Sequence, residues 1–226
     1  MKAMILAAGR GNRMGSLTQD SPKPLLKVKG KCLIDWHLHK LSEAGFRDIV
    51  INVSYLSEKI IQYVGDGSKW HLNITISNES VALETAGGIK KAITYLGSEP
   101  FVVINADIFS NYDYQKLKSI IFKNTTLAYL VLVNNPDHNL RGDFGLSKDG
   151  AVTIDANELL TFSGIAIYDP KLFVDLEKGK KIKLSPILKS AMDKNSIQGE
   201  FFEGKWSDVG TPERLKLINL GKVDAC

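Results

Sequence analysis

The sequence of 226 residues predicts an α/β fold: one domain with a mixed, mostly parallel central sheet flanked by helices, and a smaller antiparallel part. Short apolar runs alternate with segments of helical periodicity, which is typical of parallel strands joined by crossover helices. Most of these runs are apolar on both faces, as strands are when helices cover both sides of a sheet. After residue 134 the alternation gives way to shorter pieces around a turn, which predicts the antiparallel part.

The first half of the chain is expected to supply the parallel strands and most of the helices. Its apolar or alternating runs predict strands over residues 2–8, 48–54, 72–77, 101–105 and 127–133. Three of its predicted helices close on a glycine, a residue that commonly ends a helix. The helices are expected over residues 32–45, 56–65, 84–97 and 113–123.

The second half is expected to contribute the antiparallel part. We expect an Asp149–Gly150 turn between short strands within 142–152, a strand over 160–168, two helices around 170–193 and a strand-like stretch over 204–210. No linker, repeat or low-complexity run interrupts the sequence. Residues 1–133 and 134–226 are therefore interpreted as two parts of one domain.

Composition excludes several classes of function. With 44% hydrophobic and 24% charged residues, the chain has enough apolar material for a core. A net charge of +4 does not indicate a nucleic-acid partner, and no apolar run is long enough for a signal peptide or a membrane span. Cys32 and Cys226 have no disulfide or metal-binding spacing, so a cytoplasmic protein is expected.

A loop rich in glycine and positive charge follows the first predicted strand. In an open parallel sheet, ligands bind beyond the carboxyl ends of the strands, where this loop lies. Glycines let backbone N–H groups approach an anion, and the cations add charge, so the loop predicts a site for a highly charged ligand such as a nucleoside triphosphate. Its residues are Gly9, Arg10, Gly11, Arg13 and Gly15, followed by Lys23 between Pro22 and Pro24, where an extended backbone is expected.

Two well-known phosphate loops do not match. The third glycine of the dinucleotide fingerprint would fall on Met14, and no GxxxxGK[ST] string occurs. The histidines are scattered and are interpreted as structural or surface residues: His37, His39, His71 and His138.

Two carboxylates from distant parts of the chain are candidates for a metal site. Asp107 follows the buried strand 101–105, and Asp208 lies in the strand-like stretch 204–210. Together with phosphate oxygens and water they could form the oxygen-rich site that Mg²⁺ prefers. The structural alternatives are that Asp107 caps a turn and that Asp208 pairs with a lysine.

The glycine-rich segment resembles the signature of sugar-nucleotide pyrophosphorylases, the sugar-1-phosphate nucleotidyltransferase family. It reads LAAGRGNRMGSLTQDSPKPLLKV over residues 6–28, and further blocks follow in the family's order: VGDGSKWHLNI, LETAGGI, NAD and WSDVGTPERL. The length, the LETAGG string and NNPDHNLRGDF at 134–144 are most similar to N-acetylmuramic acid α-1-phosphate uridylyltransferases of peptidoglycan recycling.

The resemblance implies a single-domain, Rossmann-like nucleotidyltransferase fold and a reaction. UTP and N-acetylmuramic acid 1-phosphate would give UDP-N-acetylmuramic acid and pyrophosphate, with Mg²⁺ as cofactor, in a monomer or homodimer. Other acceptor sugars, as in mannose-1-phosphate guanylyltransferases and glucose-1-phosphate thymidylyltransferases, remain alternatives. So does a non-catalytic, nucleotide-binding regulatory relative.

The resemblance also assigns roles to individual residues. Arg13, Lys23, Asp107 and Asp208 would be catalytic, the two aspartates by binding the metal. The nucleotide would contact Leu6, Ala8, Gly9, Gly11, Asn12, Arg13, Lys23, Glu79, Glu84 and Thr85. The sugar pocket would include Asn105, Gly142, Glu158 and Ser163. Within the one nucleotidyltransferase domain, residues 1–133 would be the nucleotide-binding half and residues 134–226 the sugar-binding half.

Some of these residues have a structural alternative, and some positions depart from the family pattern. Glu79 could be a solvated loop carboxylate, Thr85 a helix cap, and Glu158 and Ser163 plain surface or strand residues. The departures are Asn12 for a common threonine, Ser16 for proline, Ala106 for glycine, and the absence of the EKP string that supplies a second lysine.

Overall fold

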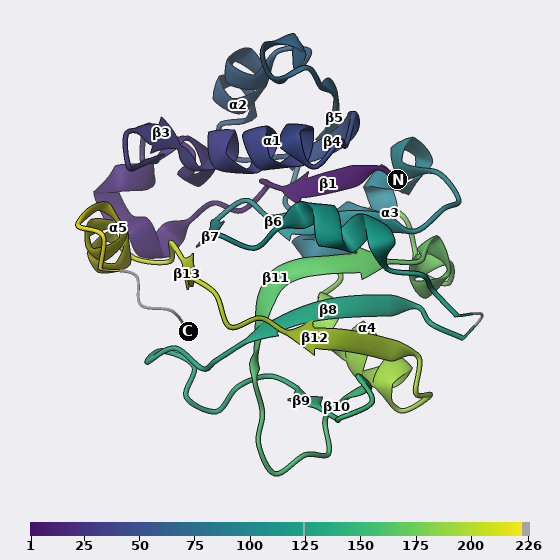
Figure 1. Cartoon of the computed structure of the whole chain (residues 1–226). Helices are drawn as coiled ribbons and strands as arrows, with labels where there is room; N and C mark the ends of the chain where they lie inside the picture. Colours follow the sequence, from purple (N-terminus) through teal and green to yellow (C-terminus); the bar gives the residue numbers. More distant parts are fainter. Residues whose placement is uncertain (124, 223–226) are drawn as a thin grey trace.

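The centre of the structure is a seven-stranded sheet with the strand order β12-β8-β11-β6-β1-β4-β5. The structure is a computed structural model that describes residues 1–123 and 125–222 (Figure 1). The strands of this sheet are β1 (Ala3–Leu6), β4 (Asp48–Val53), β5 (Asn73–Asn78), β6 (Phe101–Asn105), β8 (Ala128–Val133), β11 (Thr161–Tyr168) and β12 (Ile197–Phe201).

The sheet is mixed and mostly parallel, which confirms the predicted fold class. β1 runs parallel to β4 and β6, β4 to β5, and β12 to β8, whereas β11 is antiparallel to both of its neighbours. Because β8 lies between β12 and β11, strands from both predicted halves interleave in one sheet. The sheet therefore has no boundary at residue 133. The assignment of residues 1–133 to the nucleotide and residues 134–226 to the sugar stays a prediction.

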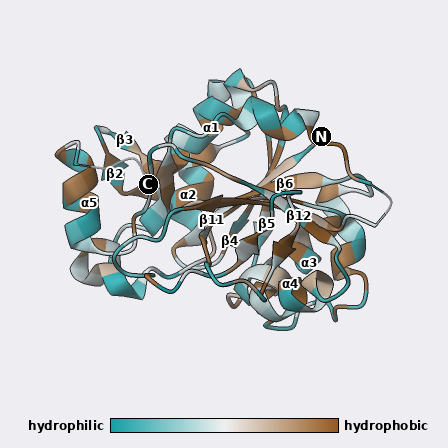
Figure 2. Ribbon diagram, turned by 60° about the horizontal axis from the view of Figure 1, so that its bottom comes forward, coloured by the Kyte–Doolittle hydropathy of each residue, from teal (hydrophilic) through white to brown (hydrophobic). Residues whose placement is uncertain are grey.

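Helices cover both faces of the sheet. Along β1 the side chains alternate, so Ala3 and Ile5 join one core cluster and Met4 joins the other. The first cluster contains residues of α1 (Leu33–Glu43) and α2 (Ser57–Val64), and the second contains residues of α3 (Glu84–Leu96) and α4 (Leu184–Met192). Figure 2 shows the hydrophobic strands between helices with hydrophilic outer faces.

Three two-stranded ladders and a fifth helix complete the fold. They are β2 (Lys27–Val28) with β3 (Lys31–Cys32), β7 (Ile108–Ser110) with β13 (Trp206–Asp208), and β9 (Gly145–Leu146) with β10 (Val152–Thr153). β9 and β10 flank the predicted Asp149–Gly150 turn and confirm it. A third core cluster joins the glycine-rich loop to α5 (Pro212–Asn219) through Met14, Leu26, Val28, Leu33, Val209 and Ile218.

Two helix predictions were wrong. Residues 113–123 form only a 3-10 helix, Tyr114–Ser119, at whose end the Ser119 hydroxyl donates to the Lys116 carbonyl at 2.7 Å. Of the two helices expected around 170–193, the first is only a 3-10 turn, Pro170–Phe173. Gly179, with φ of +84°, separates it from α4.

Among the α-helices and strands, β2, β3, β7, β12 and α5 were not predicted, and β12 and α5 are the longest of them. β12 was overlooked because Gly199 and Glu200 interrupt its apolar pattern, yet a Cβ on Gly199 would lie 2.4 Å from the Leu130 carbonyl oxygen. The glycine is therefore what lets this edge strand approach β8. α5 has only eight residues and begins at a side-chain cap, the Thr211 hydroxyl accepting from Arg214 N at 3.3 Å.

The described residues include no helix that combines the length and the apolar character needed to cross a membrane. Cys32 is buried and carries a free thiol. Cys226 lies outside the described residues.

Candidate functional site

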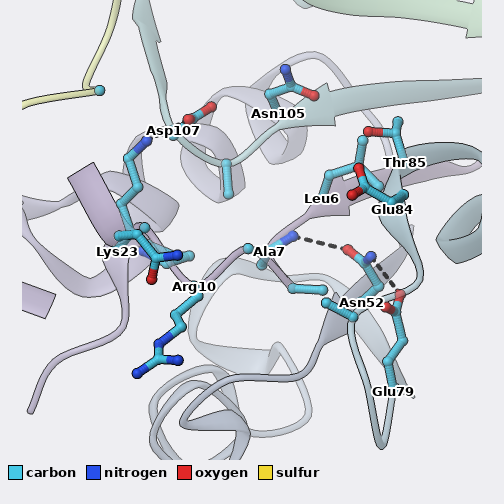
Figure 3. A pocket seen from close by; sticks show the side chains of 18 of the residues that line it. Leu6, Ala7, Arg10, Lys23, Asn52, Glu79, Glu84, Thr85, Asn105 and Asp107 are labelled. Carbon is cyan, nitrogen blue, oxygen red and sulfur yellow. Dashed lines mark hydrogen bonds and ion pairs between the residues drawn. The ribbon is translucent and has the colours of Figure 1, made fainter. Parts of the chain in front are cut away.

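A cavity of about 600 Å³ opens at the carboxyl ends of the parallel strands (Figure 3). Its wall is built from the segment after β1, from Asn52 near the end of β4, from Glu79 after β5, and from Asn105 to Asp107 after β6. Parallel strands end at the same edge of the sheet, so four chain segments converge there without long loops.

The cavity gathers most of the residues singled out from the sequence. All the residues predicted to bind the nucleotide line it, together with Asn105 and Asp107. Gly142, Glu158, Ser163 and Asp208 are not among its lining residues, although Gly210, two residues after Asp208, is. Arg10, Pro24 and Ala106 also line the cavity and were named from the sequence without a binding role, whereas Ala7, Asn52, Ala82 and Gly210 were not singled out.

Gly11 determines how the glycine-rich loop turns. Its φ is +69°, in the left-handed region, and a Cβ there would lie 3.3 Å from both Lys23 Cβ and Thr18 Cγ2. The Thr18 hydroxyl donates to the Gly11 carbonyl at 3.1 Å and holds the turn closed. The loop therefore packs directly on the segment that carries Lys23, and any side chain at Gly11 would separate the two.

Lys23 and Asp107 form an ion pair across the cavity floor. Lys23 Nζ donates to Asp107 Oδ2 at 2.5 Å, and the side chains are 10% and 34% exposed. The expected extended backbone at Lys23 was wrong, since Lys23 begins a 3-10 helix, Lys23–Leu25, and it is Pro22 that is extended. The tight turn directs the ammonium group toward Asp107 (Figure 3).

Backbone pairing brings the two candidate metal ligands together. β7 follows Asp107 and pairs with β13, so that Asp208 lies opposite Ile108, and Val209 N donates to the Asp107 carbonyl at 2.7 Å. Arg214 Nη2 lies 3.1 Å from Asp208 Oδ2, and the imidazole of His138 contacts the other carboxylate oxygen. The pairing partner of Asp208 is thus an arginine rather than the lysine considered from the sequence.

The chemistry of these two carboxylates suits a divalent cation. Asp208 Oδ1 is buried and accepts no hydrogen bond from a described residue, although His138 Nε2 lies 3.0 Å away. A buried carboxylate oxygen without a hydrogen-bond donor is a reasonable ligand for a hard cation, and the Val209–Asp107 backbone hydrogen bond brings the chain at Asp107 close to this segment. The described residues contain no group of three or more His, Cys, Asp or Glu placed to hold a metal, so phosphate oxygens or water would have to complete the coordination.

His37 and His138 lie in different environments, which their positions in the sequence did not indicate. His37 is buried and its Nδ1 lies 2.9 Å from the Tyr114 hydroxyl. Burial, and next the charge of Lys40, lower the pKa of His37 to about 4 against the opposing effect of Asp107. His37 is therefore a neutral packing residue, whereas His138 reaches the site through Asp208. No sequence signal pointed to that contact.

Glu79 braces the cavity wall. One oxygen of its carboxylate accepts from Asn52 Nδ2 at 2.8 Å and the other from Leu83 N at 2.8 Å, while Asn52 Oδ1 accepts from Ala7 N at 2.9 Å (Figure 3). A Cβ on Gly88 would lie 2.7 Å from Glu79 Oε1, so this glycine makes room for the brace. The alternative of a solvated Glu79 was wrong, since the residue is 2% exposed.

Glu84 and Thr85 lie at the start of α3, beside Leu6 (Figure 3). Glu84 is exposed and has φ of +62°, a conformation that a side chain with a Cβ rarely adopts. The cap residue of α3 is Leu83 and no side chain caps the helix, so the alternative of Thr85 as a cap was wrong. Strain at a cavity-lining residue points to a role in binding.

The residues predicted for the sugar pocket are divided. Asn105 lines the cavity and packs on Gly164, where a Cβ would lie 2.5 Å from Asn105 Nδ2. Ser163 is 1% exposed, and its hydroxyl accepts from Ile165 N at 3.1 Å within a β-bulge of β11. Gly142 packs against Leu159, and Glu158 lies exposed on the loop before β11.

Comparison with known proteins places the chain among enzymes. Residues 2–221 match the nucleotidyl transferase family. The chain is 48% identical to the N-acetylmuramate alpha-1-phosphate uridylyltransferase of Neisseria meningitidis serogroup B over 223 residues, which cover 96% of both chains. It is 34% identical to the enzyme of the same name from Caulobacter vibrioides, over 93% of this chain and 92% of that one.

The fold is shared with a solved structure. A Bacillus anthracis protein described as a putative glucose-1-phosphate thymidylyltransferase, crystallised with sucrose, superimposes with a TM-score of 0.87 at 21% identity. The alignment covers 99% of this chain and 96% of that protein. At this level of identity the likeness shows the fold, and it confirms the predicted Rossmann-like architecture.

Proposed function

The chain belongs to the nucleotidyl transferase family, and we propose that it transfers a uridylyl group from UTP to N-acetylmuramic acid 1-phosphate. The products would be UDP-N-acetylmuramic acid and pyrophosphate. The observation that carries the proposal is the 48% identity to an N-acetylmuramate alpha-1-phosphate uridylyltransferase over 96% of both chains. By that likeness the reaction would serve the reuse of cell-wall sugars, and the buried free thiol of Cys32 fits a reducing, cytoplasmic setting.

The proposed reaction is a displacement at phosphorus. A phosphate oxygen of the sugar 1-phosphate attacks the α-phosphorus of UTP, and the bond from that phosphorus to the oxygen bridging to the β-phosphate breaks. Pyrophosphate leaves with the bridging oxygen. The nucleophile is an anion at neutral pH, so no general base is needed, and catalysis consists of positioning and charge neutralisation.

The cavity offers residues for both tasks. The backbone of the glycine-rich loop would cradle the phosphates, with Arg13 on the leaving pyrophosphate and Lys23 between the α-phosphate and the sugar phosphate. Arg13 is exposed and forms no ion pair or side-chain hydrogen bond with any residue that the structure describes, so it is free to meet a ligand.

Enzymes of the family generally use a divalent metal, and we propose Mg²⁺ held by Asp107 and Asp208. The metal would neutralise charge on the phosphates. The buried, unsatisfied Oδ1 of Asp208 supports this assignment.

The proposal is tested by a panel of substrates. Sugar 1-phosphates of N-acetylmuramic acid, mannose and glucose are each combined with UTP, dTTP, GTP and CTP, and pyrophosphate release is followed in a coupled assay. We expect the highest kcat/KM for UTP with N-acetylmuramic acid 1-phosphate. A higher value for another pair would reassign the acceptor or the base, and no release with any pair would favour a non-catalytic relative.

Replacing Arg13 by alanine is expected to lower kcat by about 10²-fold or more, as for other groups that stabilise charge developing in a transition state. The pyrophosphate that Arg13 contacts gains charge as it leaves. The measurement is steady-state kinetics with UTP as the varied substrate. Arg10 is the matched control, because its guanidinium lies over the Tyr55 ring at 5.3 Å, and Arg10→Ala should lose less. A small rise in KM alone for Arg13→Ala would contradict the assignment.

Replacing Glu84 by glycine is expected to stabilise the protein and weaken UTP binding together. Glycine relieves the φ of +62°, which should add roughly 0.5–1 kcal/mol to the free energy of unfolding. Loss of the carboxylate from the cavity should weaken UTP binding about tenfold, the loss of one hydrogen bond to a charged group. Urea denaturation and calorimetric titration measure the two effects.

The control is His71, which is exposed, lies outside the cavity and has φ of +57°. His71→Gly should gain similar stability and leave UTP binding unchanged. If Glu84→Gly bound UTP as the wild type does, the strain at Glu84 would have no connection with the nucleotide.

A further inference from the structure

Arg214 lies beside Asp208, and the proposed reaction assigns it no role. Its side chain is 15% exposed, slightly more buried than that of Asp208 at 17%, and its Nη2 lies 3.1 Å from Asp208 Oδ2. Nε and Nη2 of Arg214 are buried and form no hydrogen bond of good geometry with a described residue. Burying a permanently charged guanidinium with unsatisfied donors costs free energy, which indicates a functional role for the group.

The chain is built to admit this guanidinium. A Cβ on Gly210 would lie 1.7 Å from Arg214 Nη2 and 2.7 Å from Asp208 Oδ2, so any other residue there would have to displace the guanidinium and shift the carboxylate. The glycine of the WSDVGTPER segment therefore opens the space in which the arginine meets the aspartate. Gly210 also lines the cavity, so the pair lies directly behind the cavity wall.

Arg214 is held rigidly relative to the rest of the site. It lies in the first turn of α5, where its backbone N donates to the Thr211 hydroxyl at 3.3 Å. α5 is anchored through Ile218 in the core cluster that also contains Met14 of the glycine-rich loop and Leu26, three residues after Lys23. The backbone of Arg214 is therefore fixed relative to the phosphate loop, and its guanidinium is held by the ion pair with Asp208.

The two oxygens of Asp208 have different neighbours. Oδ2 faces the buried guanidinium, whereas Oδ1 lies 3.0 Å from Nε2 of His138, whose side chain is 37% exposed. A carboxylate held through one oxygen by an arginine has its other oxygen directed to a defined place. Asp107 and Asp208 each have a cationic partner of their own, Lys23 and Arg214.

We propose that Arg214 is the positioning residue of Asp208: it holds Oδ2 so that Oδ1 is presented to the divalent cation. The proposal rests on the metal role assigned to Asp208 under the proposed function. Arg214 itself touches neither substrate nor metal, and it acts through the orientation of the carboxylate.

The first test combines three variants with kinetics. Arg214→Ala removes the guanidinium, Gly210→Ala displaces it, and the double variant does both. We expect each single variant to lower kcat at saturating Mg²⁺ by about tenfold or more, a change of about 1.4 kcal/mol in the barrier. Because the added methyl group would lie 1.7 Å from Arg214 Nη2 and also 2.7 Å from Asp208 Oδ2, we expect the double variant to lose at least as much kcat as Arg214→Ala but less than the product of the two single losses. Additive losses, or a kcat for Arg214→Ala within about threefold of the wild type, would overturn the proposal.

The second test does not depend on turnover. Crystals of the wild type and of Arg214→Ala are soaked with Mn²⁺, whose anomalous signal locates the cation. In the wild type we expect Mn²⁺ against both Asp107 and Asp208, and in the variant we expect the Asp208 carboxylate to rotate away while Asp107 stays. An unchanged Asp208 with Mn²⁺ still bound would contradict a positioning role. This readout stands even if the acceptor sugar is another one.

Two further variants separate position from charge and from folding. Arg214→Lys keeps the charge without the planar fork, so kcat should remain at least about threefold below that of the wild type. Full recovery by lysine would show that charge alone matters. Lys216→Ala, on the same helix, should leave kcat and the melting temperature unchanged and serves as the matched control.

Discussion

Replacing Asp107 by asparagine is expected to lower kcat by about 10³-fold or more, which abolishes practical turnover. An amide has the shape of the carboxylate without its charge, so it cannot neutralise a divalent cation. The fold should persist, because Asp107 lies at the end of β6 on the cavity wall and outside the three core clusters. The loss of the partner of Lys23 should cost about 1 kcal/mol of stability.

The measurements are coupled pyrophosphate release, circular dichroism and thermal melting. Asp193, exposed at the end of α4 and remote from the cavity, supplies the control: Asp193→Asn should keep full activity. Wild-type turnover in excess chelator, or near-normal turnover in Asp107→Asn, would refute the role of a metal at this carboxylate.

The strands of the sheet could be predicted because their pattern is local. Residues 101–105 were expected as a strand and are β6 with the same bounds, since five consecutive apolar or amide residues between turn signals leave little choice. β12 is different, because Ile197–Phe201 carries Gly199 and Glu200 and becomes a strand through its pairing with β8. The tertiary contact overrides a weak local preference there.

The site could be predicted to the extent that its residues follow strands in the sequence. Gly11 and Asp107 could be identified in this way, because they follow β1 and β6 in the sequence. Lys23 lies in the segment that packs on Gly11. Asn52 had a weaker signal: it is the polar residue inside the buried strand Asp48–Val53, and its amide bonds Ala7 and Glu79.

Contacts between distant segments carry no local signal, and these are the ones that were missed. His138 reaches Asp208 from a distant part of the sequence, and Gly88 is needed only because Glu79 and Asn52 meet beside it. The same reason explains why the alternative of a solvated Glu79, which came from its place in a loop, was wrong. Its carboxylate instead accepts hydrogen bonds from Asn52 and Leu83 in the cavity wall.

Replacing Lys23 by alanine is expected to lower kcat by about 10²–10³-fold and to weaken binding of the sugar 1-phosphate. Two anions must approach each other for the reaction, and we propose that the Lys23 ammonium lies between them. Lys23 is 10% exposed and lies on a 3-10 turn packed against Gly11. Because the side chain is already ordered by Asp107, little conformational freedom remains to be lost when substrates arrive. Steady-state kinetics with each substrate varied in turn separates the two effects.

Arginine should not replace this lysine. The planar guanidinium is larger than the ammonium, and the space is limited by Gly11, where a Cβ would already lie 3.3 Å from Lys23 Cβ. Lys23→Arg should therefore recover less than about a tenth of the lost kcat. Lys27, exposed in β2 and beyond Pro24, is the matched control, and Lys27→Ala should be tolerated. A near-normal kcat for Lys23→Ala, or a larger loss for Lys27→Ala, would show that the cation between the two phosphates lies elsewhere.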